Sequence, residues 1–193
     1  MVRQLTHWMA NAIILGSLLL LPVEAKELAG ITLPDEITAA NNETLTLNGM
    51  GLREKYWFDI YVGALYIPKK TSVVVDILSQ PGAMRIQMDF VYKEVESVKL
   101  LKAWKQGFEK NQSKERLNNL QSRIEVFYSY FADNAKKNDR FILDYLPQQG
   151  TTISKNDSVL GVIKGDDFRN ALLEIWLGNF PADKSLKKGM LGL

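Results

Sequence analysis

Gly49-Met50-Gly51-Leu52-Arg53 stands at the head of residues 49–67, which read GMGLREKYWFDIYVGALYI and organise the rest of the chain. The second half of this stretch alternates with the two-residue period of a strand. One face would carry the apolar set Phe58, Ile60, Val62, Ala64 and Tyr66. The other would carry the mixed set Trp57, Asp59, Tyr61, Gly63 and Leu65, which is typical of a strand with a second layer or a ligand over part of it. The sequence therefore predicts a strand over 57–67, entered through a glycine-flanked loop that ends at Arg53.

Arg53 has two interpretations. It is either a charge at the rim of the domain or the anchor of an anionic ligand. Tyr61 follows on the mixed face, where its hydroxyl would join the guanidinium in binding a carboxylate. The alternative for Tyr61 is an ordinary place at the edge of the core, with its hydroxyl in water.

The N-terminus has the features of a secretory signal. Arg3 precedes an apolar run over Ala10–Leu21, and Val23-Glu24-Ala25 matches the small-x-small cleavage pattern. The run is shorter than the ~20 residues that span a bilayer. We therefore expect residues 1–25 to be a cleaved signal peptide and residues 26–193 to form one exported, periplasmic domain. The alternative is an uncleaved anchor.

Composition excludes several kinds of chemistry. The chain has no cysteine, and its single histidine, His7, lies in the predicted signal. The mature part therefore has no thiol nucleophile, imidazole base or Cys/His metal site, and we expect no cofactor. Lys and Arg number 24 against 22 Asp and Glu, without a basic stripe, so nucleic-acid binding is not expected. We expect Asp59, Asp89 and Asp144, which lie in alternating stretches, to face solvent or pair with basic neighbours.

The order of the periodic segments predicts the fold class. Strands are expected at 31–34, 36–38, 45–48, 84–90 and 141–145, with a hairpin of 151–154 and 159–163 around Asn156-Asp157. Amphipathic helices are expected at 93–110, from about 114 to 131 with Ser113 as the cap, and from 166 to 177. Residues 73–78 fit a strand or a short helix, and a short turn follows Pro181. Runs of strands and helices indicate an α+β domain with helices on one face of a mostly antiparallel sheet.

Several motifs resemble the chalcone isomerase-like family, and in particular its exported bacterial branch. They lie, in order, at residues 47–53, 61–66, 99–104, 144–147, 150–151, 165–168, 171–178 and 183–189. The resemblance implies an open-faced β-sandwich, in which a large antiparallel sheet is covered by a layer of helices.

The resemblance also implies a cleft. The isomerases of this family carry a set of polar side chains in that cleft, and this sequence lacks most of them. Arg53 matches the family arginine, and Lys102 falls near the family's helix lysine. Ile60 and Ile175 stand where the enzymes keep hydroxyls, and the helix tyrosine has no counterpart near Lys99. An arginine with a strand tyrosine resembles instead the carboxylate clamp of the family's fatty-acid-binding branch, which Arg53 and Tyr61 would supply.

These observations lead to one expected function and two alternatives. The expected function is non-catalytic binding of a small amphipathic anion such as a fatty acid. Arg53 and Tyr61 would hold the head, Lys102 would lie nearby, and Trp104 and Ile175 would line the apolar part. The first alternative is an intramolecular lyase or isomerase with an unknown substrate. The second is a cell-envelope accessory protein that acts through a protein partner.

Overall fold

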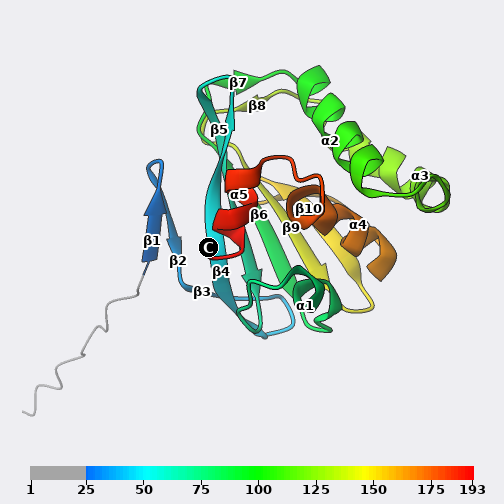
Figure 1. The fold of residues 1–193 in the computed structure, drawn as a ribbon, viewed down its shortest axis with the longest axis horizontal. Helices are drawn as coiled ribbons and strands as arrows, with labels where there is room; N and C mark the ends of the chain where they lie inside the picture. The colour runs from blue at the N-terminus through cyan, green and yellow to red at the C-terminus, as the bar shows by residue number, and fades with distance from the viewer. Residues whose placement is uncertain (1–24) are drawn as a thin grey trace, which may run out of the picture.

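The structure is a computed structural model that describes residues 25–193. Its centre is a seven-stranded antiparallel sheet in the order β11-β10-β9-β6-β5-β4-β3 (Figure 1). In chain order the elements are β1 (Ala25–Leu28), β2 (Ile31–Pro34), β3 (Glu36–Thr38), β4 (Thr44–Lys55), β5 (Phe58–Ile67), α1 (Val74–Ser79), β6 (Met84–Phe90), β7 (Glu94–Val95), α2 (Ser97–Asn111), α3 (Lys114–Ser129), β8 (Ala135–Lys136), β9 (Arg140–Leu146), β10 (Gly150–Lys155), β11 (Ser158–Ile163), α4 (Asp166–Leu177) and α5 (Lys184–Met190).

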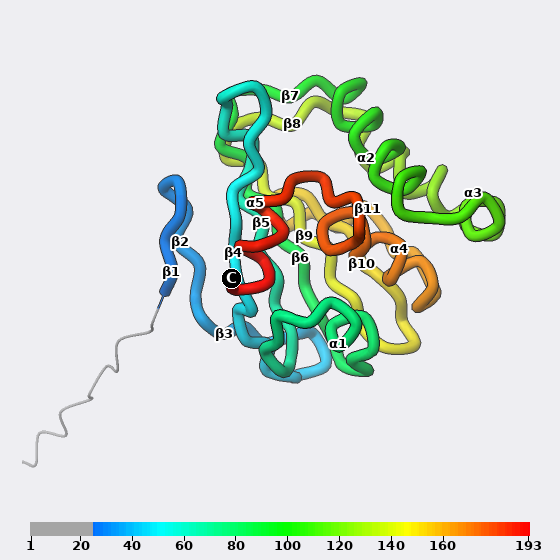
Figure 2. The backbone as a smooth tube through the Cα atoms, in the orientation of Figure 1, coloured from blue at the N-terminus to red at the C-terminus, as the bar shows by residue number. Residues whose placement is uncertain are grey.

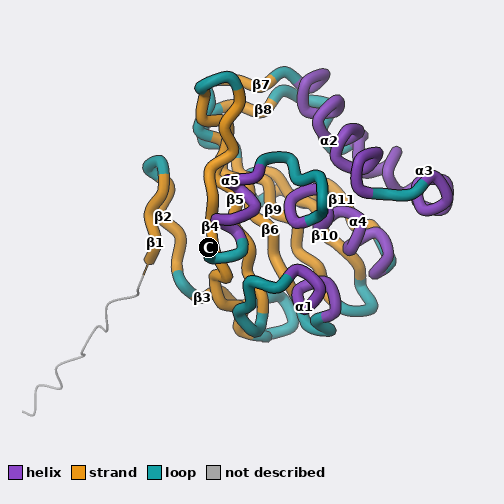
Figure 3. The backbone as a smooth tube through the Cα atoms, in the orientation of Figure 1, coloured by secondary structure: helices purple, strands orange, loops and turns teal. Residues whose placement is uncertain are grey.

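The predicted fold class is confirmed. Helices α4 and α5 lie over one face of the sheet, and α2 packs on α4 (Figure 3). The α2–α3 pair extends to one side, while the β1–β2 hairpin stands apart from the helices (Figure 2). The predicted signal peptide lies outside the described residues except for Ala25, which begins β1. Among residues 25–193, no helix combines the length and apolar character needed to cross a membrane.

Two expectations about residues 49–67 were wrong. Gly49–Arg53 is not a loop, because these residues lie inside β4, which pairs with β5 along nearly its whole length. Trp57 is not in the strand, because Tyr56 and Trp57 form the two-residue turn of the β4–β5 hairpin. The glycines suggested a loop because glycine is conformationally free, but here they serve a close packing contact.

That contact joins the sheet to α5. The sequence predicted only a short turn in this region, whereas the structure has a helix. A Cβ on Gly51 would lie 2.7 Å from the Leu186 carbonyl oxygen, and one on Gly49 would overlap the Gly189 carbonyl oxygen. Gly63, opposite Gly51 on β5, faces the Leu186 side chain. Helix and sheet backbones can therefore approach closely only where side chains are absent. Asp183 caps α5, because its side chain accepts hydrogen bonds from the backbone N–H groups of Ser185 and Leu186.

The sheet separates two apolar clusters. The larger lies between the sheet and the helices and includes Tyr61, Leu65, Trp104 and Phe127. The smaller lies on the opposite face, where Leu33 of β2 packs with residues of β4 and β5 such as Tyr66. Both faces of β5 are therefore buried, which explains its near-continuous apolar sequence.

The carboxylates of the alternating stretches are mostly paired, as expected. Asp144 accepts two hydrogen bonds from Arg85, at 2.6 and 2.7 Å. Asp89 is buried and accepts from Arg140 at 2.6 Å and from Gln87 at 2.7 Å. Asp59 is exposed. These carboxylates stabilise the sheet, and their arrangement supplies no catalytic pair.

Other local expectations hold, with changed ends. Residues 73–78 resolve as helix α1, and α3 begins after Ser113, whose side chain accepts from the Arg116 N–H. The expected helix over 93–110 begins only at Ser97, because Glu94 and Val95 form β7, which pairs with β8. The hairpin turn at Asn156-Asp157 is confirmed, and both residues have positive φ.

Candidate functional site

Arg53 and Tyr61 lie side by side because of the β4–β5 register. They are direct cross-strand partners, and the Arg53 guanidinium carbon lies 5.6 Å from the centre of the Tyr61 ring. A bulge follows this pair, because Glu54 pairs with Asp59 and leaves Ile60 as an extra residue. Arg53 is half-buried and takes part in no ion pair within residues 25–193. Its guanidinium therefore keeps its capacity to bind an anion.

Tyr61 is buried and joins the strand to helix α4. Its hydroxyl oxygen accepts a hydrogen bond of 3.0 Å from the indole N–H of Trp176. The hydroxyl hydrogen remains available for donation, since a phenol both accepts and donates. The alternative of a hydroxyl in water is thus wrong, because the Tyr61 side chain is only 1% exposed.

Tyr61 is one of six aromatic side chains that form a closed cycle of contacts in the core. Successive contacts run through Tyr61, Phe90, Phe141, Phe131, Trp104 and Trp176. The Trp104 ring lies 5.4 Å from that of Trp176, and its own buried indole N–H has no acceptor within the described residues. A buried N–H without an acceptor is costly. Trp104 therefore adds a donor without an acceptor to this aromatic cluster.

The remaining predicted site residues are placed differently. Ile175 is buried on α4, where it packs against Gly107 of α2. Lys102 is exposed on α2, so nothing in its placement brings it to Arg53. Ile60 stands at the position where the enzymes of the family keep a hydroxyl. It lies at the bulge and supplies only hydrocarbon there.

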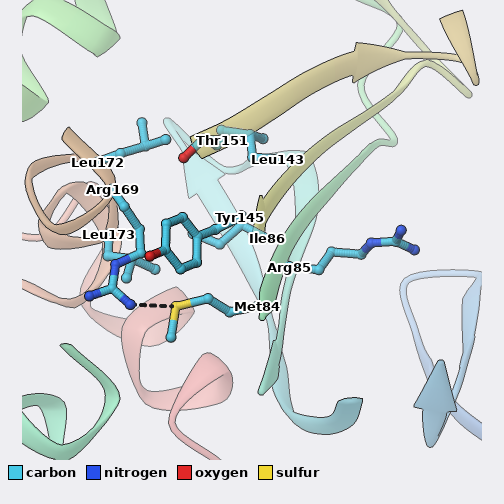
Figure 4. A pocket seen from close by; sticks show the side chains of 9 residues that line it. All are labelled: Met84, Arg85, Ile86, Leu143, Tyr145, Thr151, Arg169, Leu172 and Leu173. Carbon is cyan, nitrogen blue, oxygen red and sulfur yellow. Dashed lines mark hydrogen bonds between the residues drawn. The ribbon is translucent and has the colours of Figure 1, made fainter. Parts of the chain in front are cut away.

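A small cavity lies further along the sheet, between β6, β9 and α4 (Figure 4). Its volume is about 20 Å³, which suits one water molecule and not a fatty acid. Arg169 and Tyr145 point toward each other across it, whereas Arg85 points to the opposite side of the sheet (Figure 4). Burial, followed by a hydrogen bond to Asp166, raises the pKa of Tyr145 to about 12, so this phenol stays protonated as a donor.

Arg169 is a buried structural cation. Its guanidinium donates to the carbonyl oxygens of Leu78 at 2.9 Å and Gln80 at 3.0 Å, and lies over the Tyr145 ring. These bonds fix the end of α1 to α4. We expect Arg169→Ala to lower the free energy of unfolding by about 2–3 kcal/mol, since two carbonyls lose a charged donor. Urea unfolding measures this, with Arg116→Ala, a half-exposed arginine that lies 3.6 Å from Glu174, as the comparison. Equal losses in the two variants would contradict the assignment.

A larger pocket of about 440 Å³ lies at the junction of the helices. Lys110, Arg116, Lys187 and Glu174 supply its charged groups, and its apolar lining comes from α1, the end of α4 and Phe180. Arg116 lies 3.6 Å from Glu174, and Lys187 donates to the Gly178 carbonyl oxygen. This pocket was not predicted from the sequence, because its lining residues come from five separate segments of the chain. It is a second place where an amphipathic anion would find cations beside hydrocarbon.

The fold is a seven-stranded antiparallel sheet under a helical layer, with an arginine–tyrosine pair on the β4–β5 hairpin, and it defines the class of protein. Residues 25–192 match the profile of the chalcone isomerase-like family, and the chain belongs to this family. The structure is also similar to the crystal structure of a fatty-acid binding protein from Arabidopsis thaliana. That match has a TM-score of 0.67 and 17% identity over 87% of this chain and 96% of the plant protein, which establishes similarity of fold. No curated protein matches the sequence.

Proposed function

We propose that this protein is a non-catalytic member of the chalcone isomerase-like family, of its exported bacterial branch, and that it binds a small amphipathic anion such as a fatty acid. The observation that carries the proposal is the pairing of Arg53 with Tyr61, whose donors are not used up by partners in the described part of the chain. Arg53 has no ion-pair partner among residues 25–193, the Tyr61 hydroxyl hydrogen is available, and the buried Trp104 N–H has no acceptor. A carboxylate is an acceptor-only group and would complement Arg53 and Tyr61, which are direct cross-strand partners.

The apolar surroundings support a lipid-like ligand. Tyr61, Trp104 and Ile175 belong to one apolar cluster, and each buried CH₂ of a tail contributes ~0.8 kcal/mol. The similarity of fold to a plant fatty-acid binding protein supports the same class of ligand. Ile60 and Ile175 offer no hydroxyl for proton transfer, which favours holding a ligand over converting one.

The test measures binding of palmitate to the purified protein by calorimetry. We expect Arg53→Met to weaken binding about 10- to 100-fold, because a hydrogen bond to a charged group contributes ~1.5–3 kcal/mol. Lys102→Met is the matched control and should leave the affinity unchanged, since Lys102 is exposed on α2.

A third variant separates the two candidate places. Arg116→Met removes a cation from the 440 Å³ pocket. If it abolishes binding while Arg53→Met does not, the ligand lies in that pocket and the Arg53 assignment is wrong. If the unmodified protein binds no palmitate at micromolar concentrations, the proposed function itself fails. Turnover of a chalcone that depends on Arg53 would favour the enzyme alternative.

A further inference from the structure

The β4–β5 hairpin ends in three consecutive exposed aromatic residues, Tyr56, Trp57 and Phe58, here called the aromatic tip. Their exposed fractions are 79%, 99% and 54%. The tip lies at the end of the sheet beside β7 and β8 (Figure 2). It therefore projects apolar area into solvent at a place where the core gains nothing from it.

The conformation of the turn is unfavourable for these residues. Tyr56 and Trp57 have φ of 50° and 71°, the left-handed region that favours glycine and asparagine. A two-residue hairpin turn is formed most readily by Asn-Gly, whereas bulky side chains are strained there. Neither turn chemistry nor burial accounts for a Tyr-Trp pair at this position.

The tip is held in place by its neighbours. The Phe58 ring packs on Tyr92, with centroids 5.3 Å apart. The Lys55 ammonium lies over the Tyr56 ring at 5.6 Å. The aromatic side chains are thus presented outward on a supported hairpin, which lowers the entropy lost when they bind a partner.

The chemistry around the tip fits a lipid surface. Tyr and Trp combine an apolar body with a polar atom and are enriched where hydrocarbon meets headgroups. Exposed Lys55 flanks the tip, and Lys93, next to Tyr92, is joined to Lys137 by a backbone hydrogen bond. These ammonium groups suit lipid phosphates, while Glu54 and Asp59 keep the local charge nearly balanced. Insertion of aromatic area, more than attraction between charges, would therefore drive binding.

We propose that the aromatic tip inserts into the headgroup–acyl boundary of a phospholipid bilayer and docks the protein there. Arg53 lies on β4, three residues before Tyr56 of the turn, or roughly 10 Å at the rise of a strand. Where the proposed function holds, docking at the tip would bring the anion site close to the membrane from which an amphipathic ligand leaves. The docking itself does not depend on that ligand.

The test uses phosphatidylcholine vesicles containing one quarter phosphatidylglycerol and no fatty acid. Within residues 25–193 the tryptophans are Trp57, Trp104 and Trp176, and the last two are only 5% and 1% exposed. Vesicles should therefore shift the emission of Trp57 to the blue and protect it from acrylamide. Cosedimentation should show partitioning that persists on pure phosphatidylcholine.

The decisive variant is the double substitution Tyr56→Asn with Trp57→Gly. It gives the turn its favoured sequence, so the fold should be kept or stabilised. Partitioning should fall about tenfold or more, because most of the inserted aromatic area is lost. Phe180→Ser, which removes an exposed aromatic elsewhere, is the control and should partition like the unmodified protein.

The inference is overturned if the unmodified protein does not partition, or if the Asn-Gly variant partitions equally well. A tip-dependent dimer that forms without vesicles would assign the tip to contact between two copies instead. Because palmitate binding is measured in solution, its failure and the failure of vesicle binding are separate results.

Discussion

Gly51→Val should lower the free energy of unfolding by about 3 kcal/mol, the upper end of the usual cost, because side chains that overfill a packed contact force the backbone to move. A Cβ at position 51 would lie 2.7 Å from the Leu186 carbonyl oxygen and 2.9 Å from its Cα. These are backbone atoms of α5, so no side-chain rotation relieves the overlap. Valine adds two further methyl groups, and α5 would have to leave the sheet. Urea unfolding followed by circular dichroism measures the loss.

Gly30→Ala is the control for the general cost of replacing a glycine. Gly30 has φ of +77°, but a Cβ there would meet nothing within 4 Å. It should therefore cost only the conformational strain of about 1–2 kcal/mol. If Gly51→Val were no more damaging than Gly30→Ala, the close contact between α5 and β4 would be disproved.

Phe127→Ala should cost about 3–5 kcal/mol, the range for removing a buried aromatic side chain. Phe127 is fully buried on α3 and contacts the rings of Trp104, Phe131 and Phe168, at centroid distances of 5.0, 4.9 and 5.8 Å. Its loss leaves a cavity behind Trp104. At ~2–4 °C per kcal/mol for a domain of this size, the melting temperature should fall by roughly 6–20 °C.

Val126→Ala, one position earlier on the same helix, is the matched control. Val126 is exposed, so its truncation should change stability by at most about 0.5 kcal/mol. A similar melting temperature for both variants would show that α3 does not pack on Trp104. Because Trp104 is expected to line the apolar part of the proposed site, Phe127→Ala should also weaken palmitate binding if that site is correct.

The elements predicted well are those whose signal is local. Residues 84–90 alternate strictly and form β6 as expected. Ser113 caps α3, and Asn156-Asp157 turns the β10–β11 hairpin, because each side chain or φ preference acts within a few residues. The strands that were missed, such as β7 and β8, have two residues each and carry no periodicity. For α5, Asp183 before a short apolar pattern was a cap signal that could have identified the helix.

The candidate site was only partly predictable. Arg53 and Tyr61 stood out in the sequence by residue type, and the β4–β5 register then placed them together. The donor from Trp176 to Tyr61 joins residues 115 positions apart, and no local pattern reports such a contact. The 440 Å³ pocket could not be predicted either, because its lining residues are far apart in the sequence.

Residues 49–67 show where the boundary lies. The alternation of residues 57–67 was enough to predict a strand with one apolar face and a mixed face partly covered, because side-chain period follows directly from backbone geometry. The alternation could not reveal why positions 49 and 51 are glycines. A side chain at either position would collide with the backbone of α5, which lies more than 130 residues later in the sequence. Nor could the alternation distinguish a buried Tyr61 from an exposed Trp57 on the same presumed face. That distinction was set by the hairpin turn and by the helices that cover one end of the strand and leave the other in solvent.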